Sequence, residues 1–290
     1  MFQSVSELVA EANQVGSIAE VMIQLECQTT RMPRHEVIKK MEQQLSVMEN
    51  AAKKGTAGVS SATGLTGGDA TKLEAYLAKG NFLSGETILI AVQNAIATNE
   101  VNAAMGLICA TPTAGSAGVV PGVLFAAKDR LDLDRDAMVR FLFVAGAFGL
   151  VIANNASISG AEGGCQAEIG SASAIASAAL VDAAGGTPEM CSAAIAMVLK
   201  NMMGLICDPV AGLVEVPCVK RNALGASQAM ISADMALAGI TSVIPTDEVI
   251  EAMYKVGRQM PSIFKETAEG GLADTPTGRE IKMRIFGQSV

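Results

Sequence analysis

The sequence has few of the residues that mark nucleic-acid-binding and zinc proteins. It contains no tryptophan, one histidine and 3% aromatic residues, and its formal net charge is −8. A nucleic-acid partner is not expected, because such partners are bound by basic surfaces and by aromatic rings that stack on bases. A zinc site is not expected either, since C-x₂-C pairs and further histidines are missing.

Signs of a membrane or secreted protein are also missing, although 50% of the residues are hydrophobic and the mean hydropathy is +0.37. The longest apolar run, residues 141–153, is too short to span a bilayer, and Asn154 follows it. The first residues, MFQSVSELVAEANQVG, include glutamates and no basic region before an apolar stretch, unlike a signal peptide. We therefore expect a cytoplasmic protein without a membrane partner.

Strand signals are scarce as well, whereas helical periodicity recurs along the chain. One helix is expected to begin near Pro33 and to end just before Gly55, since proline favours helix starts and glycine favours helix ends. A second pattern covers residues 84–109 and ends in a cysteine. With no clear linker or internal repeat, the prediction is an all-α fold, a single compact helical domain over residues 1–290.

Three aspartates at alternate positions, Asp132, Asp134 and Asp136, resemble the start of a calcium-binding loop. The glycine and the glutamate that such a loop needs at its sixth and twelfth positions are absent. These aspartates are instead expected to cap the apolar helix that follows them, because carboxylates stabilise helix N-termini.

Two glycine-rich segments interrupt the helical patterns. They are GTAGVSSATGLTGGDATK at residues 55–72 and TPTAGSAGVVPG at residues 111–122. Neither matches a dinucleotide-binding motif or a phosphate-binding P-loop. Each is open to two interpretations, a tight connection between helices or a loop whose backbone amides approach a small ligand.

The six cysteines fall into two groups. Cys165 follows two glycines, Cys207 precedes Asp-Pro and Cys218 follows Val-Pro, so each lies beside a helix-breaking residue. Cys165 in particular is expected at a loop-to-helix junction, where the helix dipole favours the thiolate. Three thiolates without a fourth ligand suggest a [4Fe–4S] cluster with one open iron, although core packing also explains cysteines at these spacings. The second group of cysteines lies in or at the ends of apolar helices and is expected to be structural. It consists of Cys27, Cys109 and Cys191.

Three segments carry a resemblance to a known family. SISGAEGGCQAEIGSASAIASAAL (157–180), CDPVAGLVEVPCVKRNA (207–223) and TPTAGSAGVVPG (111–122) are similar to the α chain of the iron–sulfur-dependent L-serine dehydratases. The resemblance covers nearly the whole chain. It implies an all-helical catalytic domain in which Cys165, Cys207 and Cys218 hold a [4Fe–4S] cluster. It also implies a lyase that converts L-serine to pyruvate and ammonia without pyridoxal phosphate.

Such chemistry needs an iron, a substrate pocket and a base. An open iron that binds substrate oxygens would acidify the α-proton and stabilise the departing hydroxyl. The glycine-rich loops are expected to bind the small amino-acid substrate. Their predicted substrate-binding residues are Thr66, Gly67, Gly68, Thr113, Ala114, Gly115 and Ser116.

The catalytic base is not identified by the sequence. The one histidine, His35, lies in a segment expected to be an exposed helix. In the family that the chain resembles, a histidine from an additional domain is thought to serve, which implies a β chain as partner. Further candidates within this chain are Ser157, Ser159 and Glu162, whose alternative role is helix capping.

Three other interpretations stay open at this point. A related [4Fe–4S] lyase, such as an L-cysteine desulfidase, would use the same three cysteines. A non-catalytic helical scaffold subunit would use them only in its core. A pyridoxal-phosphate dehydratase would need a loop lysine facing a phosphate cradle, and Lys128 and Lys220 are the lysines near the loops of interest.

Overall fold

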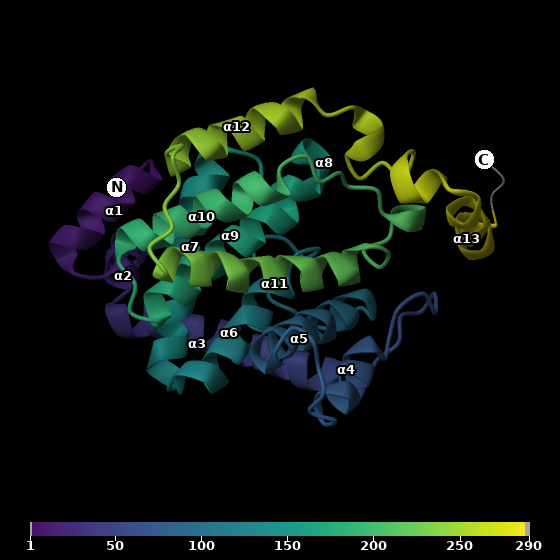
Figure 1. The fold of residues 1–290 in the computed structure, drawn as a ribbon, viewed down its shortest axis with the longest axis horizontal. Helices are drawn as coiled ribbons and strands as arrows, with labels where there is room; N and C mark the ends of the chain where they lie inside the picture. Colours follow the sequence, from purple (N-terminus) through teal and green to yellow (C-terminus); the bar gives the residue numbers. More distant parts are fainter. Residues whose placement is uncertain (1, 288–290) are drawn as a thin grey trace.

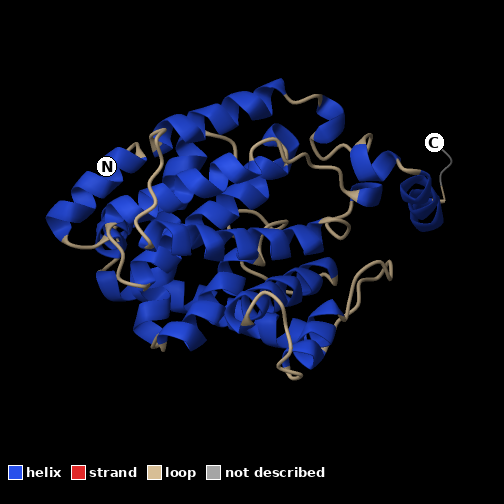
Figure 2. Ribbon diagram, viewed as in Figure 1, coloured by secondary structure: helices blue, strands red, loops and turns tan. Residues whose placement is uncertain are grey.

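The computed structural model describes residues 2–287, and all regular secondary structure in that range is helical (Figures 1 and 2). The prediction of an all-α fold in one compact domain is confirmed. Thirteen α-helices follow one another along the described chain. They are α1 Val5–Val15, α2 Ile18–Thr30, α3 Arg34–Ala57, α4 Asp69–Leu77, α5 Glu86–Ala103, α6 Val119–Leu131, α7 Arg135–Asn155, α8 Gly160–Gly163, α9 Cys165–Ala183, α10 Pro188–Met202, α11 Cys218–Leu237, α12 Thr246–Gln259 and α13 Pro276–Phe286.

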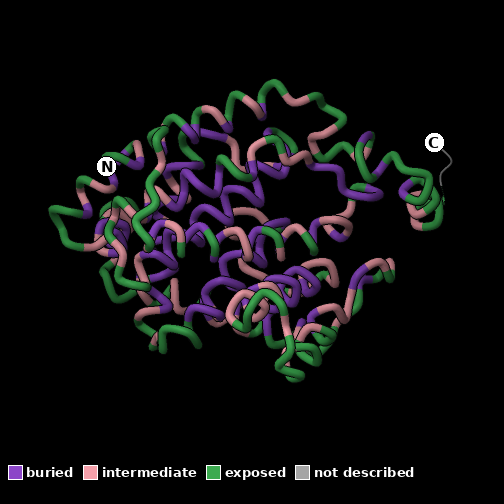
Figure 3. The backbone as a smooth tube through the Cα atoms, viewed as in Figure 1, coloured by how far each residue is buried: buried purple, intermediate pink, exposed green. Residues whose placement is uncertain are grey.

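Helix α9 forms the centre of the molecule. Every residue from Cys165 to Val181 is buried, and α6, α7, α10 and α11 pack around the helix (Figures 1 and 3). Its side chains are mostly Ala, Ser and Gly. Small side chains let neighbouring helix backbones approach closely on several sides, which explains how one helix packs against several others.

Helix α7 is long and strongly apolar. By length and composition it qualifies as a membrane span, but 61% of its most apolar stretch is buried inside the domain. Phe141 and Phe148 are both fully buried in it. This burial agrees with the expected core helix. The expected cap is also present, because the Asp134 carboxylate accepts the backbone N–H of Ala137 at 2.8 Å.

Several predicted boundaries are wrong. Helix α3 continues to Ala57, and Gly55 lies inside it against Ala97 of α5 instead of following its end. Helix α5 stops at Ala103, so Cys109 lies in a connecting segment. The chain there leaves the helix through Met105, whose φ of 58° is left-handed.

The C-terminal arm, defined here as residues 261–287, lies apart from the helical core. It contains the short 3₁₀ helices η2 (Ser262–Phe264) and η3 (Gly271–Asp274), followed by α13. Helix α13 packs on η3 and on η1, a 3₁₀ turn at Val210–Gly212, and projects from one end of the molecule in Figure 1. Because η1 lies between Cys207 and Cys218, the arm packs beside the segment that joins these two cysteines.

Candidate metal centre

The three cysteines singled out by the sequence come from three different backbone settings. Cys165 is the first residue of α9, after Gly164 with a φ of 75°, and Cys218 is the first residue of α11. Cys207 lies in an extended segment, where its backbone N–H donates to the Phe264 carbonyl at 2.8 Å. All three are buried, with exposed fractions of 1%, 2% and 6% for Cys165, Cys207 and Cys218. The expected loop-to-helix junction at Cys165 is therefore present.

Two of these thiols and a carboxylate form a close group. The sulfur atoms of Cys165 and Cys207 and a carboxylate oxygen of Glu168 all lie within 4.8 Å of one another. Cys218 lies outside that group. It begins α11, and Arg221 of the same helix donates to the Cys165 sulfur at 3.4 Å. The structure thus brings all three predicted cysteines to one buried region.

The thiols of this region differ in their ionisation. The hydrogen bond from Cys207 lowers the pKa of Cys165, and the positive charge of Arg221 lowers it further. The pKa of Cys207 is raised, first by this interaction with Cys165 and then by burial. Burial is also the main cause of the raised pKa of Cys218. Cys165 is therefore the thiol that ionises first, and metal ligation requires the thiolate form.

Arg221 joins the three cysteine-containing segments, because it lies on the helix that begins at Cys218 and contacts the segments of Cys165 and Cys207. It lies on α11 one turn after Cys218, and its guanidinium donates to the Cys165 sulfur at 3.4 Å and to the Ile206 carbonyl at 2.9 Å. A 2.7 Å ion pair joins it to Asp208, with side-chain exposures of 13% and 3%. A planar guanidinium carries five N–H donors in a fixed fork, so it can make these contacts in different directions at once.

Glu168 is a site residue that the sequence interpretation missed. It lies three residues after Cys165, so both side chains lie on the same face of α9. The Thr113 hydroxyl donates to its carboxylate, and the residue is only 8% exposed. Burial raises the pKa of this carboxyl group, and the Thr113 hydrogen bond opposes the rise. An isolated glutamate in a run of small residues was the available signal.

Two glycines leave room beside the group. A Cβ atom on Gly115 would lie 2.5 Å from the Glu168 carboxylate. A Cβ atom on Gly160 would lie 3.0 Å from the Cys207 sulfur and 3.3 Å from a carboxylate oxygen of Glu266. A side chain at either position would fill the space next to the thiols and Glu168.

The predicted substrate loop at residues 111–118 reaches this region through Thr113. Its other polar groups are used internally, since the Ser116 hydroxyl donates to the Thr111 carbonyl at 3.1 Å. Asn102 donates to the Ala114 carbonyl at 3.0 Å, and Asn99 and Asn222 donate to the Gly115 carbonyl at 3.1 and 2.7 Å. These bonds fix the loop, which is expected of a preorganised binding element.

The second predicted substrate loop contacts the connection between Cys207 and Cys218. The hydroxyls of Thr63 and Thr66 donate to the buried Glu215 carboxylate at 2.8 and 3.1 Å. Gly67 leaves no room for a side chain, because a Cβ atom would lie 2.7 Å from the Ser60 Cα atom. Gly68, with a φ of 76°, precedes α4. This loop therefore supports the cysteine connection, and Thr66 already has a protein partner.

The structure does not bring the three further base candidates into the close group. Ser159 caps α8 by accepting the Ala161 N–H at 3.2 Å, and the Ser157 hydroxyl accepts the Ser159 N–H at 3.1 Å. Glu162 is exposed and lines a separate cavity of about 580 Å³, together with Arg258. Local capping accounts for both serines, as the alternative interpretation expected.

The remaining cysteines lie elsewhere. Cys191 is fully buried in α10, as expected of a core residue, and burial raises the pKa of its thiol. Cys27, expected to be a structural residue buried in its helix, is only partly buried in α2. Cys109 is also partly exposed, and its thiol donates to Gln44 at 3.1 Å.

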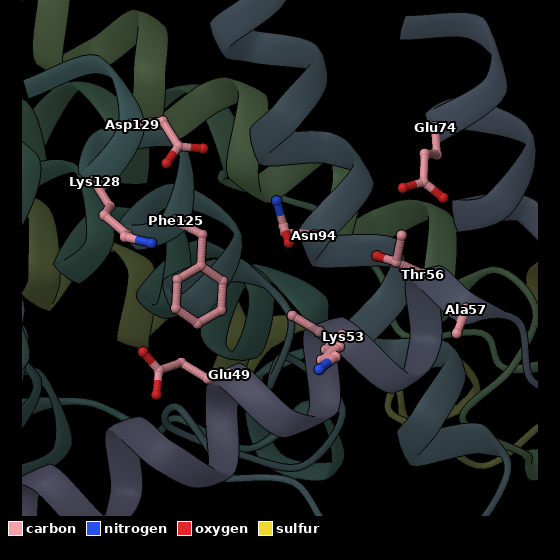
Figure 4. Close-up of a pocket in the computed structure, with 10 residues that line it drawn as sticks. Glu49, Lys53, Thr56, Ala57, Glu74, Asn94, Phe125, Lys128 and Asp129 are labelled. Atoms are coloured by element: carbon pink, nitrogen blue, oxygen red, sulfur yellow. The ribbon is translucent and has the colours of Figure 1, made fainter. Parts of the chain in front are cut away.

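A surface hollow of about 460 Å³ lies on another part of the molecule, between α3, α4, α5 and α6. Figure 4 shows the Phe125 ring near its middle, with Lys128 on one side and Lys53 on the other. No cysteine lines this hollow. Lys128, one of the two lysines considered above, therefore belongs to a region distinct from the three cysteines. The other, Lys220, forms an ion pair with Asp69.

Comparison with known proteins places the chain among relatives of nearly the same length. The serine dehydratase alpha chain family model matches residues 13–273. A probable L-serine dehydratase alpha chain of Bacillus subtilis is 64% identical over 288 residues, covering 99% of this chain and 96% of the relative. The L-serine dehydratase alpha chain of Peptoniphilus asaccharolyticus is 40% identical, with 97% of each chain covered.

A longer relative matches in part. L-serine dehydratase 1 of Escherichia coli is 43% identical over 181 residues, which are 62% of this chain and 40% of that protein. The family model and the two near-full-length relatives together show that this chain belongs to the serine dehydratase alpha chain family.

Proposed function

We propose that this chain is the catalytic alpha chain of a [4Fe–4S]-dependent L-serine ammonia-lyase, which converts L-serine to pyruvate and ammonia in the cytoplasm. The near-full-length relatives named as L-serine dehydratase alpha chains support the substrate. The cofactor is supported by the close group of Cys165 and Cys207 with Glu168, and by the burial of Cys218 at the start of the helix whose Arg221 contacts Cys165.

The residues present fit an iron–sulfur cluster. Thiolates are the usual ligands of such clusters, whereas calcium and magnesium prefer oxygen ligands. Gly160 places no side chain against the Cys207 sulfur, and Arg221 provides positive charge beside Cys165. Cys165, Cys207 and Cys218 would each hold one iron, and pyridoxal phosphate has no assigned role.

When bound, such a cluster supplies Lewis acidity at the iron that lacks a protein thiolate. The residues of this chain hold and enclose the substrate. Thr113 and Glu168 line one side of the region, and Gly115 keeps space open next to Glu168. Of the two predicted substrate loops, residues 113–116 are better supported than residues 66–68, because Thr113 contacts Glu168 directly.

A base from a partner β chain completes the proposal. His35 is exposed at the start of α3 and belongs to none of the segments that form the cysteine region. The name alpha chain, printed for two relatives, fits a protein with a second chain. The E. coli relative agrees, because the matched part is 40% of its length and leaves room for further domains.

The first test is the iron and acid-labile sulfide content of protein purified without oxygen. About four of each per chain are expected. Replacing Cys165, Cys207 or Cys218 with serine should remove most of both. The matched controls are Cys27→Ser and Cys191→Ser, which should keep the wild-type content.

The second test is pyruvate formation from L-serine and sulfide release from L-cysteine, each measured with and without the partner chain. Pyruvate formation that depends on the partner is expected. Negligible iron after anaerobic reconstitution would rule out the cluster, and full activity of the isolated chain would rule out the need for a partner. Preferential attack on L-cysteine would favour a desulfidase.

A further inference from the structure

The buried carboxylate of Glu168 lacks a cationic partner of its own. Within residues 2–287 its one hydrogen-bond donor is the Thr113 hydroxyl, and it forms no ion pair. Arg221, the nearby cation, is committed to Asp208 at 2.7 Å and to the Ile206 carbonyl at 2.9 Å. A buried charge ordinarily has an oppositely charged partner, because desolvation is costly.

The surroundings of this carboxylate suit a small cation. The carboxylate of Glu266 adds negative charge near Glu168, and the sulfur atoms of Cys165 and Cys207 lie within 4.8 Å of the Glu168 carboxylate oxygen. The space beside the carboxylate is kept free of side chains by Gly115 and Gly160, whose Cβ atoms would lie 2.5 and 3.4 Å from Glu168 oxygens. Neither glycine therefore places a side chain against the carboxylate.

We propose that the Glu168 carboxylate binds the ammonium group of the amino-acid substrate, with Thr113 as the residue that positions it. This assignment rests on the proposed function. A free amino acid carries one ammonium group and one carboxylate, and only the ammonium is attracted to Glu168. Since the carboxylate oxygen lies within 4.8 Å of the Cys165 and Cys207 sulfurs, an ammonium held there places the rest of a small amino acid beside the metal ligands.

The experiment compares L-serine with 3-hydroxypropionate, the same molecule without the amino group. In the iron-loaded complex with the partner chain, Glu168→Gln should raise the KM for L-serine about 10- to 100-fold, since it removes a hydrogen bond between charged groups. The inhibition constant of 3-hydroxypropionate should change by less than about threefold, because that ligand makes no contact with Glu168. Thr113→Val should also raise the KM for L-serine, by a smaller factor, and should also leave the inhibition constant of 3-hydroxypropionate nearly unchanged.

Glu86→Gln is the matched control, because Glu86 is an exposed glutamate in the first turn of α5, outside the cysteine group. It should leave both constants unchanged. The assignment would be overturned if Glu168→Gln weakened the binding of both ligands equally. It would also be overturned if that variant changed neither constant. Loss of iron from that variant, which would make Glu168 a metal ligand, would overturn it too, as would a large fall in kcat at constant KM, which would give Glu168 a role in the chemical step.

The variants also separate this inference from the function on which it rests. If Glu168→Gln fails to fold, the Thr113→Val comparison decides the matter. Wild-type protein that binds no iron or forms no pyruvate contradicts the proposed function. If the wild-type protein is active but the variants affect L-serine and 3-hydroxypropionate equally, only the role of Glu168 is contradicted.

Discussion

At the scale of single residues, Glu100 shows how a buried carboxylate can support the loops around the site. It is 1% exposed near the end of α5, and it accepts the backbone N–H groups of Asp69 and Ala70 at 2.8 and 3.4 Å. It therefore caps α4, directly after the Thr66–Gly68 turn. Burial raises the pKa of Glu100 from its usual 4.5, and the two N–H bonds oppose the rise.

This shift predicts a pH-dependent cost in stability. Between the unfolded and folded pKa values, the folded state keeps a proton that the unfolded chain releases, so the free energy of unfolding falls as pH rises. The loss amounts to about 1.4 kcal/mol for each unit by which the pKa is raised. Glu100→Gln keeps an oxygen acceptor and removes the ionisation. Its stability relative to wild type should therefore increase from about pH 4.5 upward and then level off.

Thermal unfolding of both proteins between pH 4.5 and 7.5 measures this difference. Glu86→Gln is the control, because Glu86 is exposed in the first turn of α5. A difference between Glu100→Gln and wild type that is the same at every pH would contradict the predicted titration.

The residues of the site were predictable to different degrees. Cys165, Cys207 and Cys218 stood out because each adjoins a glycine or a proline, and such residues place a side chain at a helix start or in a connection. Glu168 and Arg221 carried a weaker signal. Each lies three residues after one of these cysteines, and that spacing places two side chains on one helix face only if the helix begins at the cysteine.

At the scale of helices, close packing explains a glycine that the sequence interpretation assigned to a helix end. Gly55 lies inside α3, where a Cβ atom would be 2.7 Å from the Ala97 Cα atom of α5. Gly55→Ala should lower the free energy of unfolding by about 1–3 kcal/mol, because α3 and α5 must separate to admit the methyl group. Denaturant unfolding measures the change.

Gly146→Ala is the matched control. Gly146 lies in α7 with no atom within 4 Å of its Cβ position, so alanine should stabilise that helix by about 0.5–1 kcal/mol. Equal effects of the two substitutions would mean that the α3–α5 contact does not require glycine.

Helix boundaries were harder to predict than helices. The pattern of residues 84–109 continues past the end of α5 at Ala103, because the connecting segment is itself apolar. The helix ends where Met105 adopts a left-handed φ and Gly106 returns against Val101, with its N–H donating to the Val101 carbonyl at 2.8 Å. Such a turn depends on contacts that periodicity does not report.

At the scale of the whole molecule, the site lies where the central helices meet the C-terminal arm. The arm is attached by backbone bonds, since Cys207 donates to the Phe264 carbonyl at 2.8 Å and Glu266 donates to the Cys207 carbonyl at 2.9 Å. The Leu272 N–H also donates to Asp208 at 2.7 Å. Long-range backbone pairing of this kind leaves no local pattern in the sequence.

This arrangement predicts which parts of the protein respond to metal removal. Residues 203–217 contain no α-helix, and the arm is fastened to them, so cysteine–iron bonds would hold both segments. Chelating the iron should therefore speed hydrogen exchange at residues 204–217 and 262–272 by about tenfold or more, equivalent to at least about 1.4 kcal/mol of local stability. The buried helices α6 and α7 should exchange at unchanged rates. Exchange that rises equally throughout the chain would instead mean that the metal stabilises the entire fold, as it does in small zinc domains. Unchanged exchange at residues 204–217 would contradict iron binding by Cys207.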